Sequence, residues 1–271
     1  MTLTIDGTAL DNIPFGWEVL GDTEISSSVS NALIDAQASG RDGSIARLRA
    51  PRSAPIIPVV METPKANLSL LRMLLRSGKI LGDTDTPGRF AVMECAQIAD
   101  TMIYAANGPD VPELHEVRAM LKLPEIYWYD DTVTTSAAVS IVGSAGTTRY
   151  ATVFPGATGP NRKSLVRLKG PTISIIVTDV VSQTYFTYSP NLPASSYLRF
   201  DAETGKAWVT NTDTWFGGTE VTEFVRTGRG PYPLELAPAI VAGVATTTLA
   251  ITGTASTGAT IEVRGQARHD R

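Results

Sequence analysis

The chain has 271 residues, of which 43% are hydrophobic and 18% are charged, and this excludes a disordered chain because enough apolar surface is available for a core. The net charge of −4 at pH 7 argues against a general nucleic-acid binder, which normally carries an excess of basic residues. A single cysteine, Cys95, excludes an internal disulfide, so packing and assembly must hold the fold together.

The first residues, MTLTIDGTALDN, lack the basic start and the apolar core of a signal peptide. The longest apolar runs, such as PAIVAGVA at 238–245, are far shorter than the roughly 20 residues that a membrane-spanning helix needs. We therefore expect a protein that is made in the cytoplasm, with no signal peptide and no membrane span.

The N-terminal stretch begins with a strand. Leu3 to Ile5 alternate and then meet Asp6-Gly7, which predicts a short strand followed by a tight turn. Residues 17–25 are a second strand candidate, with Trp17 on its apolar side. Residues 26–40 show no firm period, so we predict irregular or weakly paired structure there.

A hairpin is predicted at Asp42-Gly43, because the turn requires a positive φ that these residue types tolerate. After it, residues 45–50 alternate in the manner of a strand. Residues 53–64, SAPIIPVVMETP, contain three prolines, and proline donates no hydrogen bond to a β-ladder. We therefore expect an edge strand or a broken strand over 53–64.

The clearest helix of the chain follows. Thr63 is a suitable N-cap and Pro64 fits the first helical position, while Gly78 marks the end. Leucines recur at intervals of three and four residues and form one apolar stripe, which indicates packing on the core. The stripe consists of Leu68, Leu71, Leu74 and Leu75.

The rest of the first half reads as strands. We expect a polar turn over 82–89, strands over 90–96 and 102–105, and a half-buried strand over 115–123. In the last of these, Val117 and the apolar residues at every second position define the buried face, and we place His115 on the opposite face. The aromatic segment IYWYDD closes a first domain, residues 1–130.

From residue 131 onward the composition changes to Thr, Ser, Ala, Gly and Val, in many short β-branched runs with polar turns between them. This pattern is typical of an all-β sandwich or barrel. Asp201 to Gly205 reads as a hairpin turn, and no helix is expected. Residues 131–271 are therefore predicted to form a second domain.

The chain offers little for catalysis or for cofactors. His115 and His269 are not beside a plausible nucleophile, no nucleophile elbow occurs, and 228–230 lacks the third glycine of a dinucleotide fingerprint. One cysteine and two distant histidines exclude a zinc site. Asp83 and Asp85 resemble part of a calcium loop but lack its closing glutamate, so we read a solvated turn. We predict no catalytic residue, no cofactor and no metal.

Two interpretations that involve carbohydrate stay open. Carboxylates suitable for a glycoside hydrolase are present, but spacing in the sequence does not choose a pair among Asp130, Asp131, Asp201, Glu203, Glu220 and Glu223. Aromatic residues of the second half could instead hold a sugar, although core and hairpin packing is the favoured explanation for them. These aromatics are Trp208, Trp215, Phe216 and Tyr232.

The segment SGRDGSIARLRAPR, residues 39–52, concentrates four arginines around the predicted hairpin. A solvated hairpin is one explanation. A protein–protein edge is another, because the planar guanidinium pairs with carboxylates and arginine is enriched at interfaces. Phosphate binding is the weakest of the three, since the chain is acidic and no aromatics are interleaved with the arginines.

The layout resembles that of a siphophage distal tail protein, of the Dit-like type that is also known as a minor tail protein in phages of actinobacteria. The segments that carry the resemblance are LTIDGTALDNIPFGWEV, SGRDGSIARLR, the helix TPKANLSLLRMLLRSG, LKLPEIYWYD, YLRFDAETGKAWVTN, PLELAPAIVAGVATTTLAIT and ATIEVRGQARH.

The resemblance implies a mainly β protein with an N-terminal β-sandwich-like ring domain that carries one α-helix, and a C-terminal galectin-like antiparallel β-sandwich. It implies a structural, non-enzymatic protein of the virion tail that forms a hexameric ring between the tail tube and the hub with its host-recognition apparatus. Receptor-binding proteins or cell-surface glycans are further partners, and no nucleic-acid sequence would be recognised. The alternative is a carbohydrate-binding module or a β-sandwich glycoside hydrolase.

The same resemblance assigns the arginine-rich hairpin to contacts between subunits. The expected interface residues are Gly40, Arg41, Asp42, Gly43, Arg47 and Arg49. Trp215 and Phe216 are the expected contact residues of the outer domain.

Overall fold

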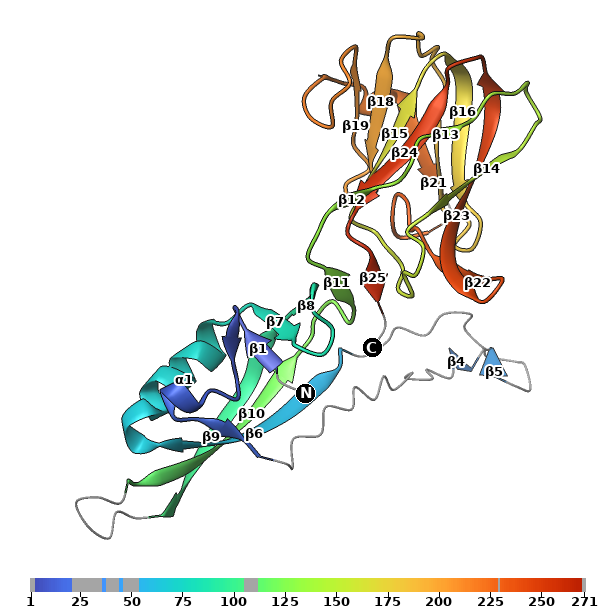
Figure 1. The fold of residues 1–271 in the computed structure, drawn as a ribbon. Coiled ribbons are helices and arrows are strands. Elements are labelled where there is room, and N and C mark those ends of the chain that lie inside the picture. Colours follow the sequence, from blue (N-terminus) through green and yellow to red (C-terminus); the bar gives the residue numbers. More distant parts are fainter. Residues whose placement is uncertain are drawn as a thin grey trace. The chain divides into compact units, whose positions relative to one another are not determined.

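The computed structural model describes residues 3–20, 36–37, 44–45, 54–104, 112–228 and 230–269. The chain divides into two compact units, residues 1–128 and 129–270 (Figure 1). The described residues form antiparallel sheets and contain a single α-helix, so the predicted mainly-β, sandwich-like fold class is confirmed. None of the helices among them is long and apolar enough to cross a membrane.

The first unit contains most of its regular structure between residues 54 and 128. Its elements are β1 (Leu3–Ile5), β2 (Thr8–Ala9), the 3₁₀-helix η1 (Ile13–Phe15), β3 (Glu18–Val19), β4 (Ala36–Gln37), β5 (Ser44–Ile45), β6 (Ile56–Pro64), α1 (Lys65–Ser77), β7 (Ile80–Asp83), β8 (Arg89–Val92), β9 (Glu94–Tyr104) and β10 (Leu114–Lys122), and the short strand β11 (Trp128–Asp130) spans the boundary with the second unit.

Two sheets and the helix enclose the core of the first unit. One sheet has the strand order β3-β6-β10-β9, and the other contains β2-β1-β7-β8. Helix α1 contacts β6, β9 and β10, and its buried Leu68, Leu71 and Leu75 join side chains of both sheets. Each fully buried leucine stabilises the fold by roughly 2–3 kcal/mol. The leucine stripe read from the sequence is therefore core packing, as predicted.

The start of α1 differs from the prediction. Its N-cap is Pro64, not Thr63, because β6 remains paired with β10 as far as Pro64 opposite Leu114. Thr63 is consequently a fully buried strand residue, and the Lys65 N–H donates to the Glu113 carbonyl. A tertiary contact thus satisfies a donor that the sequence assigned to a side-chain cap.

Gly78 ends the helix as predicted, but its role is close packing. Its φ is −60°, which any residue adopts, and its N–H donates to the Leu74 carbonyl. A Cβ at this position would lie 2.1 Å from Cγ2 of Ile5. The side chain of Ile5 thus requires glycine at the point where the helix passes over β1.

The strand predictions of the first half hold with two corrections. The predicted strands 90–96 and 102–105 are wrong as separate elements, because Met93 interrupts the chain early and β9 then runs unbroken for 11 residues. His115 was placed on the wrong face: it has the same parity as Val117 and is 9% exposed. Its Nε2 lies 3.0 Å from the Glu113 carboxylate, a hydrogen bond, whereas its buried Nδ1 has no hydrogen-bond partner and lies 3.6 Å from the Asp100 carboxylate.

The proline-rich segment forms one continuous strand rather than a broken one. β6 pairs with β10 along all nine of its residues. On its other side β3 covers only Met61 and Glu62 among the described residues, so most of β6 lies near a sheet edge, where proline is tolerated.

The second unit is a sandwich of two sheets. Its elements are β12 (Thr134–Thr135), β13 (Val139–Ser140), β14 (Arg149–Val153), β15 (Ser164–Lys169), β16 (Thr172–Asp179), β17 (Tyr185–Tyr188), β18 (Tyr197–Asp201), β19 (Ala207–Thr210), β20 (Thr219–Glu220), the 3₁₀-helix η2 (Thr222–Phe224), β21 (Val225–Gly228), β22 (Pro238–Val241), β23 (Val244–Ala255), β24 (Thr260–Gly265) and β25 (Arg268–His269).

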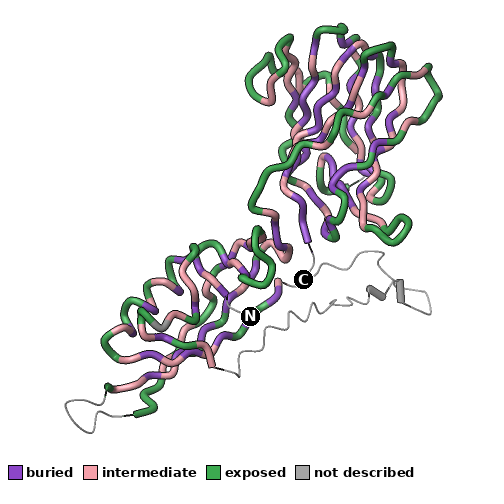
Figure 2. Tube along the Cα trace, in the orientation of Figure 1, coloured by how far each residue is buried: buried purple, intermediate pink, exposed green. Residues whose placement is uncertain are grey.

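One sheet has the order β12-β24-β15-β18-β19-β20 and the other β14-β23-β16-β17-β21. Buried and exposed residues alternate along their strands (Figure 2), which is the period-two pattern of a half-buried sheet. Phe186 of β17 stacks on Phe200 of β18 with ring centroids 4.1 Å apart, which joins the two sheets at the centre of the core.

Aspartates close several of the turns. At the predicted hairpin after β18, Asp201 accepts hydrogen bonds from the backbone N–H groups of Glu203 and Thr204, and the turn is confirmed. Asp83 accepts from the Asp85 N–H and the Thr86 hydroxyl in the same manner. Asp83 is buried, so the calcium-like fragment is an internally bonded turn and not the solvated one we expected.

Asp179, at the end of β16, is the most deeply buried of these carboxyl groups. It is 0% exposed and accepts hydrogen bonds from the backbone N–H groups of Val181, Ser182 and Ala237. Desolvation outweighs these three donors and raises the pKa of Asp179 from 3.8 to about 6.

Asp179 is expected to make the protein less stable as the pH rises from 4 to 7. The folded state keeps this proton up to a pH of about 6, whereas the unfolded chain loses it near 3.8. Because the folded state binds more protons in this window, the free energy of unfolding falls, by on the order of 3 kcal/mol. Urea unfolding at several pH values, compared with Asp179→Asn, measures the contribution. Parallel pH profiles for the two proteins would contradict it.

Candidate functional site

The expected subunit-interface residues lie outside the described part of the chain. They are Gly40, Arg41, Asp42, Gly43, Arg47 and Arg49. The strands on either side are described: Ala36 pairs with Ile45 and Gln37 with Ser44 in an antiparallel ladder. The turn predicted between these two strands lies outside the described residues, so the hairpin at Asp42-Gly43 stays a prediction.

The expected outer-domain residues, Trp215 and Phe216, lie in the connection from β19 to β20. We call residues 211–218 the strap, because they cross the outer face of the sheet that contains β24, β15, β18 and β19. Beneath the strap, one register row runs across five strands. The row consists of Glu262, Arg167, Arg199, Trp208 and Glu220.

Arg167 is the ionic centre of this row. It is 6% exposed, and its Nε and Nη2 donate to Oε2 of Glu262 at 3.0 and 2.6 Å. Its Nη1 donates to Oδ1 of Asp213 in the strap at 2.7 Å. The guanidinium also lies 4.4 Å from the ring of Trp215, a cation–π distance. Charge and stacking on Arg167 thus hold the middle of the strap.

Arg199, directly opposite Arg167 on β18, fixes the backbone of the strap. It donates to the carbonyl of Trp215 and, at 3.1 Å, to that of Gly217. Its guanidinium lies 4.7 Å from the ring of Trp208. Burial removes water from the guanidinium and so lowers the pKa of Arg199, an effect that the charge of Asp201 opposes.

The aromatics considered for sugar binding are mostly covered by arginines. Trp208 contacts the guanidinium of Arg199, Trp215 contacts that of Arg167, and Arg162 lies 3.8 Å from the ring of Tyr232. Phe216 differs, since 69% of it is exposed. These residues therefore pack the strap and the loops, and the aromatic rings do not form one open platform.

The candidate carboxylates for hydrolysis are separated by their contacts. Asp130 bonds His269 at 2.9 Å, Asp201 closes its own turn, and Glu220 accepts from the Thr222 hydroxyl. The part of the chain that the structure describes contains no group of three or more His, Cys, Asp or Glu side chains placed to hold a metal ion. Cys95 is partly buried, and this burial raises the pKa of its thiol.

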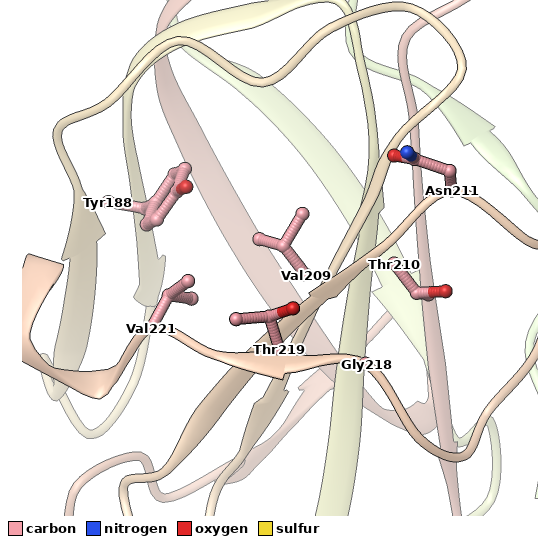
Figure 3. Close-up of a pocket in the computed structure, with 7 residues that line it drawn as sticks. All are labelled: Tyr188, Val209, Thr210, Asn211, Gly218, Thr219 and Val221. Carbon is pink, nitrogen blue, oxygen red and sulfur yellow. The ribbon is translucent and has the colours of Figure 1, made fainter.

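A pocket with a volume of about 410 Å³ opens at the base of the strap, at the edge of the sandwich between the two sheets. We call it the edge pocket (Figure 3). It is lined by Tyr188, Val209, Thr210, Asn211, Gly218, Thr219 and Val221, none of which is charged. The sequence analysis did not single out these residues as a site. The one available signal was the alternation in TYFTY, which places Tyr188 on the buried face beside Phe186.

No protein-family model and no curated protein matches this chain. A solved structure does: the crystal structure of the Dit protein (gp 19.1) of phage SPP1, described as a paradigm of the hub adsorption apparatus in phages that infect Gram-positive bacteria. The TM-score is 0.59, with 12% sequence identity and 98% of both chains covered.

This likeness shows the fold: the chain is built as a Dit protein is built, along nearly its whole length. The resemblance read from the sequence is confirmed at that level.

Glu262→Gln should destabilise the second unit by about 2–3 kcal/mol, because it removes the charge that accepts two hydrogen bonds from the buried Arg167. Asp213→Asn is the matched control on the same arginine. The Asp213 side chain is 67% exposed, so its loss should cost less than about 1 kcal/mol. Urea unfolding measures both variants, and equal losses would show that the strap contact carries as much of the charge balance as Glu262.

Proposed function

We propose that this chain is a structural protein of a phage tail tip, which assembles into a hexameric ring and connects the tail tube to the hub and the host-recognition apparatus. The observation that carries the proposal is the shared fold with a Dit protein over 98% of both chains. In this role the protein acts by binding, and it catalyses no reaction.

The open edge of β9 supports self-assembly. β9 pairs with β10 on one side, and no described strand pairs with its other side. It is 11 residues long and ends in three consecutive large exposed side chains: Met102, Ile103 and Tyr104 are 53%, 42% and 61% exposed. A long apolar edge offers unpaired backbone groups to another strand, and soluble proteins normally shorten, charge or cover such edges.

The opposite edge of the same sheet offers a partner for β9. The two-residue β3 covers only the end of β6, and beyond it the Leu20 N–H donates to the Val60 carbonyl. Pairing of β9 in one copy with this edge in the next is a head-to-tail contact, which closes into a ring when the rotation between copies is right. We therefore place the ring contacts in the first unit.

The arginine-rich hairpin remains our proposed second contact between subunits, through Gly40, Arg41, Asp42, Gly43, Arg47 and Arg49. The antiparallel β4 and β5 provide the two arms on which such a hairpin would reach a neighbour. Tail tube, hub and receptor-binding proteins are the other proposed partners, and the assembled virion tail is the proposed location.

The ring is tested by light scattering and negative-stain images of the purified protein over a range of concentrations. We expect a hexamer mass and ring-shaped particles for the wild type. The double variant Met102→Lys, Ile103→Lys should shift the mass to one subunit, because lysines on an edge oppose strand addition. Its control, Leu70→Lys, Met73→Lys, places the same charges on exposed positions of α1 and should leave rings intact. Rings formed equally by both double variants would exclude the β9 contact.

Deletion of residues 40–49 tests the hairpin separately. We expect weaker ring formation, seen as a higher protein concentration at half-assembly, while the second unit unfolds as in the wild type. Trp215→Ala, in the second unit, should leave assembly unchanged. Normal assembly of the deletion variant would show that the hairpin makes no subunit contact, and a monomeric Trp215→Ala would overturn the assignment of the ring to the first unit.

A further inference from the structure

At the edge pocket the ring of Tyr188 is buried, while its hydroxyl reaches solvent and has no hydrogen-bond partner among the described residues. Tyr188 is 5% exposed, and among the described residues nothing bonds its Oη, which lies at the pocket (Figure 3). A ligand that covered this hydroxyl without bonding it would leave it buried and unpaired, at a cost of about 1–3 kcal/mol. Burial also raises the pKa of Tyr188, which keeps the hydroxyl a proton donor.

Two more unpaired polar groups face the same space. The Asn211 Oδ1 accepts a hydrogen bond from the Ser196 hydroxyl at 2.8 Å, which leaves the amide N–H groups of Asn211 available. Figure 3 shows Asn211 and Tyr188 on opposite sides of the pocket view, with Val209 and Thr219 between them. The hydroxyl of Thr219 on β20 is exposed and bonds no described residue. The pocket thus presents neutral hydrogen-bonding groups from three separate elements.

The floor of the pocket is apolar and its shape depends on a glycine. Val209 and Val221 form the floor, as partly buried members of the core. Gly218 has a φ of +102°, and a Cβ there would lie 2.7 Å from the Val209 carbonyl oxygen. Any other residue would therefore shift the strap where it leaves the pocket.

We propose that the edge pocket binds one ring of a neutral saccharide. The apolar face of a pyranose would lie on Val209 and Val221, and its hydroxyls would bond Tyr188 Oη, Asn211 Nδ2 and Thr219 Oγ1. The pocket volume of about 410 Å³ holds one sugar ring and leaves the mouth of the pocket open for the rest of a glycan. This site does not depend on the hexameric ring.

The lining excludes two other kinds of ligand. An acidic sugar would bring its carboxylate into a pocket with no cation, where a desolvated charge has no partner. An apolar side chain from a partner protein would cover the valines but would leave the Tyr188 hydroxyl buried and unpaired. A neutral molecule with several hydroxyls on an apolar ring satisfies both the floor and the rim.

Saturation-transfer NMR on the full chain tests the proposal with methyl glycosides of glucose, galactose, mannose and N-acetylglucosamine, and with glucuronic acid. We expect at least one neutral glycoside to bind and glucuronic acid to bind more weakly. Tyr188→Phe should weaken binding about five- to tenfold through the loss of one hydrogen bond. Its unfolding free energy should stay equal to the wild type or rise, since the hydroxyl has no partner in the free protein.

Tyr185→Phe is the matched control, because it removes the same group from the same strand outside the pocket. It should leave binding unchanged. Thr219→Val provides a second reduction in affinity without a change in side-chain shape. The proposal is overturned if no neutral glycoside binds at millimolar concentration, if glucuronic acid binds best, or if Tyr188→Phe and Tyr185→Phe bind alike. None of these outcomes bears on the mass of the assembled particle.

Discussion

The stack of Phe186 on Phe200 joins the two sheets of the second unit at the centre of the core. The positions of the edge pocket and of the strap follow from this stack. On β17, Tyr188 has the same parity as Phe186, so the stack that holds Phe186 in the core also brings the Tyr188 ring between the sheets. On β18, Phe200 points inward and the neighbouring Arg199 points outward to the strap. One strand pair therefore connects the core to both the edge pocket and the strap, because successive residues of a strand alternate between its faces.

The strap shows how buried cations can hold a loop in place. Arg167 and Arg199 lie directly opposite each other, an arrangement that repulsion disfavours unless each guanidinium has its own acceptors. Arg167 uses Glu262 and Asp213, whereas Arg199 uses backbone carbonyls of the strap. The strap thus supplies acceptors to both arginines, and opening it would leave two guanidinium groups short of partners. This requirement favours a fixed strap, and with it a preformed edge pocket, since Asn211 and Gly218 are the two ends of the strap.

The sequence was a good guide wherever local chemistry decides the structure. The leucine period of α1, the Asp201 hairpin and the change to sandwich composition after residue 131 depend on neighbouring residues only, and each agrees with the structure. The errors arise where a distant segment intervenes. At the start of α1, the Glu113 carbonyl accepts the hydrogen bond that we assigned to the Thr63 side chain. At its end, the side chain of Ile5 leaves no room for a Cβ at Gly78. The edge pocket was not predictable, because it assembles side chains from both sheets and the strap, and an unpaired tyrosine hydroxyl has no signature in sequence.

The two units differ in the length of their edge strands, and this difference supports the proposal that copies contact one another through the first unit. The described edge strands of the sandwich are short: β12 and β20 have two residues each, β14 has five and β21 has four. Such short edges resist strand addition, so the second unit offers little backbone for pairing with another copy. In the first unit, β9 leaves an 11-residue edge with large apolar side chains at its end. The long unpaired edge of β9 therefore stands out against the short edge strands of the second unit. Its backbone geometry favours strand pairing with another copy of the chain, as we propose. The strap and the edge pocket lie on the unit with short edge strands, away from the edge that we propose for contacts between copies.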